Sequence, residues 1–210
     1  MNTIELFAGS RSFSKVAESR GCKVHTSDFQ DFDNINQVCD IYDFNPDAVG
    51  YIPDVIWASP PCQAFSVARI GRNWNKDNTP KTDTARLGIR IVNRTWAIIK
   101  YYQRINPNLV FIIENPRGKL RKLDLIPSKY LHTAWYCRYG NETAKPTDIW
   151  TNLKNWIPKQ CKNGNKDCHH QPAPRGSKSG IQAIKGDYLR SVVPADLCLE
   201  LLKECEKKGL

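Results

Sequence analysis

Two residues stand out as suited to covalent chemistry: a cysteine that follows two prolines, and a glutamate at the end of an apolar run. Cys62 follows Pro60 and Pro61, and Glu114 follows the apolar residues 109–113. Prolines fix the backbone and so hold the next side chain in one orientation, as a nucleophilic thiol requires. A lone cysteine is more often a small buried side chain. The double proline favours the nucleophile, because such a loop is rare as mere packing.

Short apolar runs place these residues at the ends of predicted strands. Hydrophobic spacing predicts strands at 3–7, 22–27, 55–58 and 109–113, and helices at 13–20 and 86–104. This alternation is typical of a mostly parallel α/β sheet. Ligands bind such sheets at the carboxyl ends of the strands. We therefore expect Gly9, Asp28, Cys62 and Glu114 to converge on one edge.

The other segments divide the chain into a core and two additions. Residues 34–42 resemble a short helix and strand, and residues 67–84 a polar loop. We expect a catalytic core over 1–150, a short irregular insert over 151–187, and a return to the core over 188–210. The last part has helical spacing from residue 194 to residue 207, with Pro194 at its start.

Composition limits the class of protein. The chain has 210 residues, of which 31 are Lys or Arg and 21 are Asp or Glu, giving a formal charge of +10. That charge suits a polyanionic partner, although a merely soluble basic protein is equally consistent with it. No apolar stretch is long enough to span a bilayer, so we expect no membrane association and a cytoplasmic protein. In that reducing compartment the eight cysteines should be thiols, metal ligands or catalytic groups.

Four motifs, in order along the chain, resemble the cytosine-C5 DNA methyltransferase family. Residues 6–10 (LFAGS) resemble its S-adenosylmethionine loop, and residues 59–66 (SPPCQAFS) its Pro-Cys-Gln motif. Residues 114–116 (ENP) resemble its Glu-Asn-Val motif, and Tyr139-Gly140 the start of its arginine-containing motif. The Glu-Asn-Pro variant is similar to small phage-encoded members. The resemblance implies a Rossmann-like, S-adenosylmethionine-dependent methyltransferase fold.

The resemblance also implies a mechanism and a set of catalytic residues. The target cytosine would leave the DNA stack, Cys62 would attack its C6, and Glu114 would protonate N3. Glu114 could instead simply cap a turn, since Asn115 and Pro116 follow it. Lys145 aligns with one of the family's paired arginines, where a point charge would replace a planar fork. We expect a monomer acting on double-stranded DNA in a bacterial or phage-infected host cytoplasm.

For the cofactor S-adenosyl-L-methionine, the resemblance assigns residues from several segments. The opening loop and the second strand would supply a backbone cradle and an acidic residue for the ribose hydroxyls. Asp40 and Ile41 would lie near the adenine, although a solvated surface carboxylate is an equal alternative for Asp40. The cofactor-binding residues implied are Phe7, Gly9, Ser10, Asp28, Asp40, Ile41, Pro60, Ser191 and Val193. Arg11 and Ser12 depart from the family, whose loop continues with glycines.

The insert is short where the family has a large target-recognition region, which predicts a short or relaxed recognition sequence. Its basic residues should mostly contact phosphates: Lys159, Lys162, Lys166, Arg175 and Lys178. It also holds a Cys/His set, Cys161, Cys168, His169 and His170, with Cys137 nearby in the chain. These ligand types suit zinc, but the spacing matches no standard finger. Our predicted metal ligands are Cys137, Cys161, Cys168 and His169.

Other functions remain open from the sequence. The Ser-Pro-Pro run also resembles the motif of amino-methyltransferases, which place an aromatic ring after the prolines where this chain has Cys62. A degenerate DNA-binding protein that lost cofactor binding through Arg11 and Ser12 is a second alternative. An enzyme acting on RNA or free nucleotides is a third, and the basic charge disfavours only free nucleotides.

Overall fold

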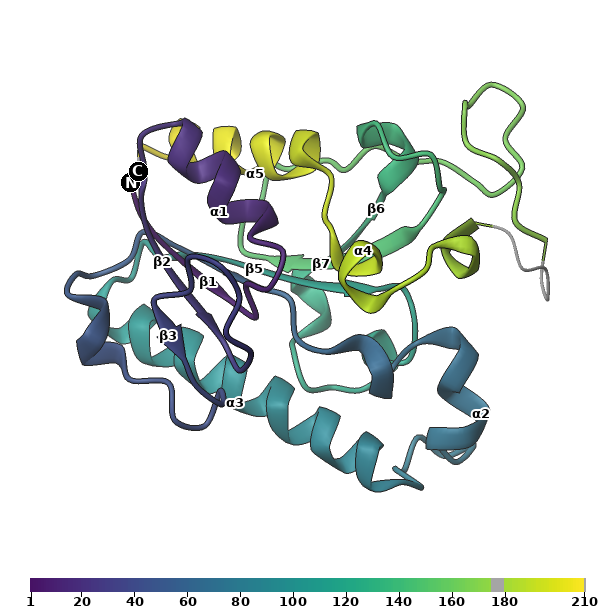
Figure 1. Ribbon diagram of the computed structural model, residues 1–210, viewed down its shortest axis with the longest axis horizontal. Coiled ribbons are helices and arrows are strands. Elements are labelled where there is room, and N and C mark those ends of the chain that lie inside the picture. The colour runs from purple at the N-terminus through teal and green to yellow at the C-terminus, as the bar shows by residue number, and fades with distance from the viewer. Residues whose placement is uncertain (175–179, 210) are drawn as a thin grey trace.

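The computed structural model describes residues 1–174 and 180–209. Within these residues a seven-stranded sheet has the order β3-β2-β1-β4-β5-β7-β6 (Figure 1). Its strands are β1 (Asn2–Leu6), β2 (Lys23–Asp28), β3 (Gln37–Val38), β4 (Val55–Ala58), β5 (Val110–Pro116), β6 (Leu131–Trp135) and β7 (Pro146–Thr151). The first five pair in parallel, and β7 runs antiparallel to both β5 and β6. The predicted mostly parallel α/β sheet is confirmed.

Helices cover both faces of the sheet. They are α1 (Ser12–Ser19), α2 (Ile70–Asn73), α3 (Asp83–Ile105), α4 (Asp187–Ser191) and α5 (Ala195–Lys207). Helices α1 and α5 lie side by side on one face, while α3 runs beneath the other (Figure 1). The three-layer arrangement leaves the carboxyl ends of β1, β2, β4 and β5 together at one edge.

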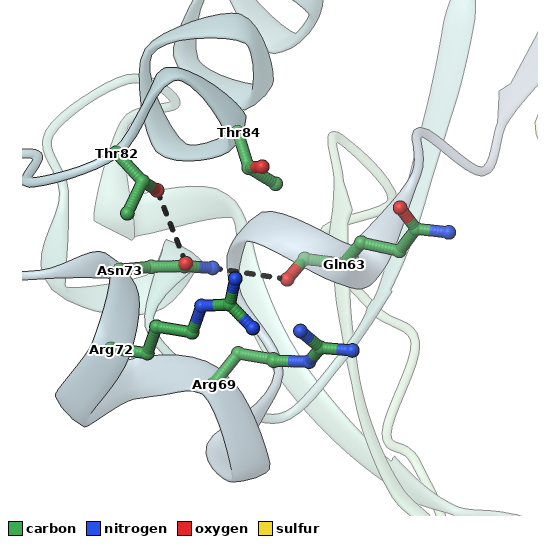
Figure 2. Close-up of a pocket in the computed structure, with 6 residues that line it drawn as sticks. All are labelled: Gln63, Arg69, Arg72, Asn73, Thr82 and Thr84. Carbon is green, nitrogen blue, oxygen red and sulfur yellow. Dashed lines mark hydrogen bonds between the residues drawn. The ribbon is translucent and has the colours of Figure 1, made fainter.

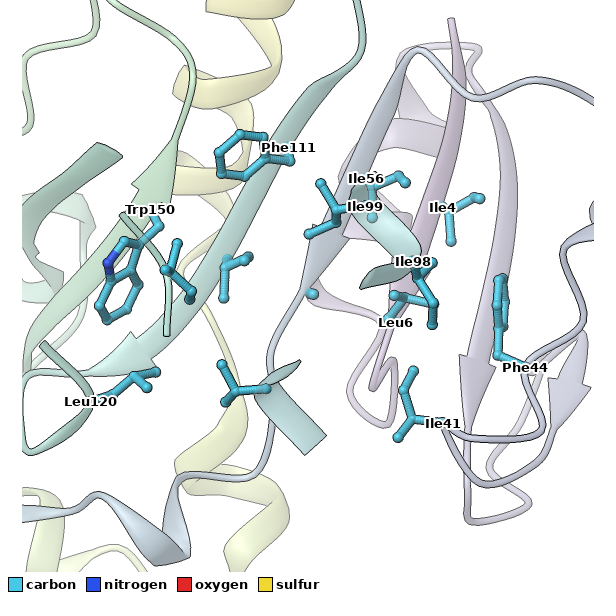
Figure 3. Packing of buried hydrophobic residues seen from close by; sticks show 14 of the residues in the cluster. Ile4, Leu6, Ile41, Phe44, Ile56, Ile98, Ile99, Phe111, Leu120 and Trp150 are labelled. Atoms are coloured by element: carbon cyan, nitrogen blue, oxygen red, sulfur yellow. The ribbon is translucent and has the colours of Figure 1, made fainter. Parts of the chain in front are cut away.

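Alternate residues of the central strands enter two separate cores, because successive side chains of a strand point to opposite faces. Ile56 and Phe111 belong to the core between the sheet and α3, part of which Figure 3 shows. Trp57 and Ile112 belong to the core beneath α1 and α5, where Trp57 stacks on Phe13 with ring centroids 5.1 Å apart. A strand that is buried on both faces has a continuous apolar sequence, which is why these strands could be predicted from the sequence.

Helix α1 is capped by a strand residue rather than by its own sequence. Its N-cap, Arg11, has a left-handed backbone and no capping side-chain bond. Glu5 of β1 instead accepts hydrogen bonds from the backbone N–H groups of Phe13 (3.3 Å) and Ser14 (2.7 Å). Burial raises the pKa of Glu5 to about 7, against the lowering effect of these bonds. The start of α1, and with it the loop that precedes it, is thereby fixed to β1.

The structure differs from the sequence-based expectations in several segments. Residues 34–42 contain β3 but no helix; Asn34 instead takes a left-handed backbone in a turn. The predicted polar loop at 67–84 contains a 3₁₀ turn, the short helix α2 and the first residues of α3. Strands β6 and β7 were not predicted. Strand β5 continues through Pro116, so Glu114 lies within the strand.

All eight cysteines lie in the described residues and are free thiols. Among the helices of the described ranges, none combines the length and the apolar character needed to cross a bilayer. Between β7 and α4, the described residues hold one short 3₁₀ helix (Gly180–Ala183) and no strand or α-helix.

Gly88 on α3 provides a test of how closely the Cys62 loop is supported. A Cβ at this position would collide with Ala64 and lie 3.1 Å from the Phe65 ring. Gly88→Ala should therefore lower the free energy of unfolding by about 1–3 kcal/mol, despite the better helix propensity of alanine. The measurement is urea unfolding followed by circular dichroism. The matched control is Gly71→Ala in α2, where an added Cβ has nothing within 4 Å. Equal or greater stability of Gly88→Ala would show that the packing there is not tight.

Candidate active site

The Cys62 loop leaves β4 at the edge where the parallel strands end. After Pro60 and Pro61, the chain turns into a 3₁₀ helix, η2 (Cys62–Ala64), and the N–H of Phe65 donates to the Cys62 carbonyl at 2.9 Å. The Cys62 side chain is half-buried. Pro60 is buried, whereas Pro61 is exposed. The prolines therefore present the thiol at a partly open surface, with its backbone fixed.

The adjacent strand holds this loop in place. Asn115 of β5 is completely buried, and its Nδ2 donates to the Pro60 carbonyl at 2.9 Å. Further along, the N–H of Lys119 donates to the Phe65 carbonyl at 2.8 Å, and Gly118 faces the same carbonyl so closely that a Cβ would collide with it. Two backbone carbonyls that flank Cys62 are thus bound by the segment that follows Glu114.

Glu114 lies next to Asn115 on β5 and is buried, with 6% of its surface exposed. Its Oε1 accepts a hydrogen bond from the Tyr136 hydroxyl at 2.8 Å. Burial raises the pKa of Glu114, while the Lys145 ammonium and the Tyr136 hydroxyl act to lower it. The net effect favours a carboxyl group that keeps its proton at higher pH than an exposed glutamate.

Tyr136 was not identified from the sequence. It begins a 3₁₀ helix, η6 (Tyr136–Tyr139), directly after β6, and is fully buried. Its pKa is raised well above the ordinary value by burial and by the Glu114 carboxyl, so the phenol remains a donor. No sequence signal marked it, because the contact joins residues 22 positions apart: Glu114 lies on β5, and Tyr136 follows β6, which is separated from β5 by β7.

Lys145 interacts with both proposed catalytic residues. It stands just before β7 with φ 24°, in the left-handed region, and is nearly buried. Burial lowers the pKa of Lys145, whereas the Glu114 carboxyl and the Cys62 thiol both act to raise it. Its Nζ donates to the Arg190 carbonyl at 2.7 Å and lies 4.6 Å from the centre of the Tyr136 ring. The structure therefore brings Cys62, Glu114 and Lys145 together.

The loop after β1 packs against the end of β2. Phe7 has a left-handed backbone with φ 61°. The N–H of Gly9 donates to Asp28 Oδ2 at 3.0 Å, and a Cβ at Gly9 would lie 2.8 Å from Cε2 of Phe32. Burial raises the pKa of Asp28, which ends β2. Gly9 is therefore packed between Asp28 and Phe32 with no room for a side chain. Acidic residues at such strand ends bind ribose hydroxyls in other α/β nucleotide-binding folds.

The two residues that depart from the family's loop, Arg11 and Ser12, are both held by contacts within the protein. Arg11 occupies a left-handed position, with φ 50°, at which glycine is favoured. Its side chain runs along α1 and forms an ion pair with Glu18. Ser12 bonds the Ser10 hydroxyl at 2.8 Å and accepts from the N–H of Val193 at 3.0 Å. Ser12 therefore connects the loop to the segment before α5.

Three other predicted cofactor residues have structural roles of their own. Asp40 is exposed and accepts a hydrogen bond from the N–H of Tyr42 at 3.0 Å. Ile41 is buried in the core beneath α3. The hydroxyl of Ser191 donates to the Tyr188 carbonyl at 2.7 Å. These contacts neither require nor exclude a ligand.

A basic pocket of about 120 Å³ adjoins the Cys62 loop (Figure 2). It is lined by Gln63, Arg69, Arg72, Asn73, Thr82 and Thr84. Buried Asn73 organises it, since its amide donates to the Gln63 carbonyl at 3.3 Å and it accepts from the Thr82 hydroxyl at 3.1 Å. The exposed Arg69 and Arg72 were not singled out in the sequence, because their segment resembled a plain polar loop.

The structure corrects one predicted metal ligand. The ligand atoms of Cys137, Cys161, Cys168 and His170 lie within 4.8 Å of one another. His169 is outside this group: it is exposed, and its Nε2 contacts the Asn141 carbonyl at 2.9 Å. The two histidines are adjacent in sequence, but only the His170 ring is buried, with its Nδ1 4.0 Å from the Cys161 sulfur.

The basic residues of the insert are only partly available to a partner. Lys159 forms an ion pair with Glu200 at 3.2 Å and lies over the Tyr139 ring. Lys162 and Lys166 are exposed. Arg175 and Lys178 lie outside the described residues.

Comparisons with known proteins give the family. No family model matches the chain. A probable DNA (cytosine-5)-methyltransferase of Frog virus 3 is 31% identical over 98% of this chain and 100% of that protein. Two solved structures are also similar: a DNMT2 mutant from Spodoptera frugiperda (TM-score 0.41, 17% identity, 81% of this chain) and the Dnmt2 methyltransferase of S. pombe (TM-score 0.45, 16% identity, 76% of this chain). The chain spans 57% and 53% of those two chains.

The match to the Frog virus 3 protein extends over nearly the whole of both chains, so it spans the segments from which the site is built. The resemblance stated from the sequence is thereby confirmed at the level of the family. This chain belongs to the DNA (cytosine-5)-methyltransferase family.

Proposed function

We propose that this chain methylates C5 of cytosine in double-stranded DNA through a covalent bond between Cys62 and C6 of the base. The observation that carries the proposal is the position of Lys145. Its Nζ lies 4.6 Å from the centre of the Tyr136 ring, and the Tyr136 hydroxyl bonds the buried Glu114 carboxyl at 2.8 Å. Both Glu114 and the Cys62 thiol act to raise the pKa of Lys145. A nucleophile, an acid and a cation thus share one site. The relative in Frog virus 3 bears the name of the same activity.

The first step requires the base to leave the DNA stack, at a cost of a few kcal/mol. The Cys62 thiolate then forms a bond to C6, and the electron pair of the C5–C6 double bond shifts through C5 and C4 onto N3. Glu114 donates its proton to N3, which neutralises the developing charge. Burial raises the pKa of Glu114, which favours the protonated carboxyl that this step needs.

The second step restores the base. When bound, S-adenosyl-L-methionine supplies the methyl group that C5 takes. C5 then gives up its proton to solvent, the bond between C6 and the Cys62 sulfur breaks, and the N3 proton returns to Glu114. Lys145 stabilises negative charge on the thiolate and the carboxylate throughout, as a point charge rather than a planar fork.

The proposed cofactor cradle uses the loops after β1, β2 and β4. Phe7, Gly9 and Ser10 would present backbone groups, Asp28 would accept hydrogen bonds from the ribose hydroxyls, and Pro60 would form the wall nearest Cys62. The carboxylate at the end of β2, bonded by the Gly9 N–H, supports this assignment. Asp40, Ile41, Ser191 and Val193 complete the proposed set at its margins.

DNA would be held chiefly through its phosphates. The chain carries a formal charge of +10, and exposed Arg69 and Arg72 flank the Cys62 loop. The short insert, with exposed Lys162 and Lys166, offers few side chains for base contacts. A short or relaxed recognition sequence follows from that scarcity.

A catalytically degenerate DNA-binding protein is the competing proposal. The choice between the two depends on whether Arg11 blocks cofactor binding. Because Arg11 pairs with Glu18 along α1, it leaves the loop uncrowded, which favours cofactor binding. Calorimetric titration with S-adenosyl-L-methionine separates the two: absence of binding at high concentration would support degeneracy. An amino-methyltransferase is disfavoured, because Cys62 occupies the position where that class needs an aromatic ring.

The nucleophile is tested by Cys62→Ala. Methyl transfer should fall by about three orders of magnitude or more, because no covalent bond to C6 can form, while cofactor binding is retained. The measurements are transfer of labelled methyl groups to DNA and calorimetry. Wild type should also be trapped covalently on a fluorocytosine duplex. Cys22→Ala, another half-buried thiol, is the control and should keep full activity. Methylation surviving in Cys62→Ala would refute the mechanism.

The pH dependence is tested by Tyr136→Phe. The Tyr136 hydroxyl lowers the pKa of Glu114, so its removal raises that pKa further. Because Glu114 must be protonated, the alkaline limb of kcat should move to higher pH by about one unit, the energy of one hydrogen bond. Tyr139→Phe on the same 3₁₀ helix is the control, since its hydroxyl bonds Glu200 instead. An unmoved limb, or one shifted to lower pH, would contradict the role given to Glu114.

Arg69→Ala and Arg72→Ala test the basic pocket. Each should weaken DNA binding at all sequences and reduce the slope of log K against log salt by about 0.9 for each phosphate that the variant no longer neutralises. Fluorescence anisotropy over a salt series measures both. Arg104→Ala, exposed near the far end of α3, should leave the slope unchanged. A slope equal to that of wild type in both pocket variants would place the DNA elsewhere.

A further inference from the structure

Four metal-ligating side chains gather outside the active site. Cys137 comes from η6, while Cys161, Cys168 and His170 come from the segment after β7. Their ligand atoms all lie within 4.8 Å of one another, and Cys161 Sγ is 4.0 Å from Nδ1 of His170. Three sulfurs and one imidazole nitrogen form a donor set that zinc prefers, with tetrahedral geometry.

The segment that carries three of these ligands has little else to hold it. Residues 161–170 contain no helix or strand, and Cys161 and Cys168 pack against a small apolar cluster of only three residues, Trp135, Cys137 and Ala144. So small a cluster supplies little hydrophobic stabilisation. A polypeptide segment without a core of its own is the kind that structural metals stabilise.

His170 is the best-defined member of the group. It is 3% exposed, although its neighbours Lys166, Asp167 and His169 are all exposed. Its Nε2 contacts the N–H of Gly164 at 3.2 Å, which leaves Nδ1 facing the sulfurs. A metal on Nδ1 would move the ring proton to Nε2, so the contact with Gly164 would have to open.

We propose that Cys137, Cys161, Cys168 and His170 bind a structural Zn²⁺ that fastens the segment 161–170 to η6. Four protein ligands fill the tetrahedral shell and leave no open position, so the ion is structural rather than catalytic. Its location gives it a further role: Cys137 follows Tyr136, whose hydroxyl bonds Glu114. The ion anchors the insert to the same short helix that orients the proposed acid.

The test measures metal content, which does not depend on methyl transfer. Full-length protein purified under reducing conditions without chelator should contain one zinc per chain by mass spectrometry. Cobalt in place of zinc should give the intense visible bands of a tetrahedral thiolate site. Cys161→Ser and His170→Ala should lose the zinc, whereas the matched control His169→Ala should retain it, since His169 lies outside the group.

Wild-type protein provides a second measurement in case the variants fail to fold. Chelation should lower its Tm, and added Zn²⁺ but not Mg²⁺ should restore it. Several results would overturn the proposal: reduced wild type that takes up neither zinc nor cobalt, loss of zinc in His169→Ala but not in His170→Ala, or a disulfide between two of the three cysteines. Protein that takes up no zinc yet methylates DNA would refute the site and leave the proposed function standing.

Discussion

The hydrogen bond from the Asn115 side chain to the Pro60 carbonyl is the contact on which the arrangement of the active site depends. The parallel pairing of β4 and β5 brings the two strand ends to one edge, but it does not fix the loop that follows β4. Asn115 makes that connection across 55 residues of sequence, inside the protein, where an unsatisfied polar group costs about 1–3 kcal/mol. Gly88 and Gly118 then close on the same loop from α3 and from the turn after β5. The loop that carries the thiol is therefore held by the Asn115 amide, by Gly88 and by Gly118, and little is left to its flexibility.

The carboxyl beside it is governed by two opposed effects. Burial favours the neutral form of Glu114, while Lys145 and Tyr136 favour the charged form, and burial prevails. For Lys145 the same burial lowers the pKa, and Glu114 opposes it. Neither group is in water, so each one's protonation depends on the other's. A site of this kind can pass a proton to a bound base and recover it without a large change in net charge.

The sequence was informative where local chemistry and periodicity coincide. Strands buried on both faces, such as β4 and β5, appear as apolar runs, and the double proline marks Cys62. It was uninformative where a structure depends on contacts between distant residues. Strands β6 and β7 are half-polar, and the buried Asp148 is paired with Arg121, a contact between distant residues that no local pattern shows. Tyr136 was missed for the same reason. His169 was chosen over His170 because composition does not reveal which ring points inward, and α2 was missed because four residues carry too little periodicity.

The contact between Lys145 and the Arg190 carbonyl has a consequence for how the protein is made. Lys145, Ser12 and the core under α1 all depend on residues from 190 onward: the carbonyl of Arg190, the N–H of Val193 and the apolar side of α5. A nascent chain on the ribosome holds both Cys62 and Glu114 long before those residues emerge. Until α5 leaves the exit tunnel, Trp57, Val110 and Ile112 lack the cover that this helix gives to their face of the sheet. The reactive thiol is therefore synthesised early, whereas the site around it is completed late. During translation the chain has a nucleophile but no finished site in which to use it.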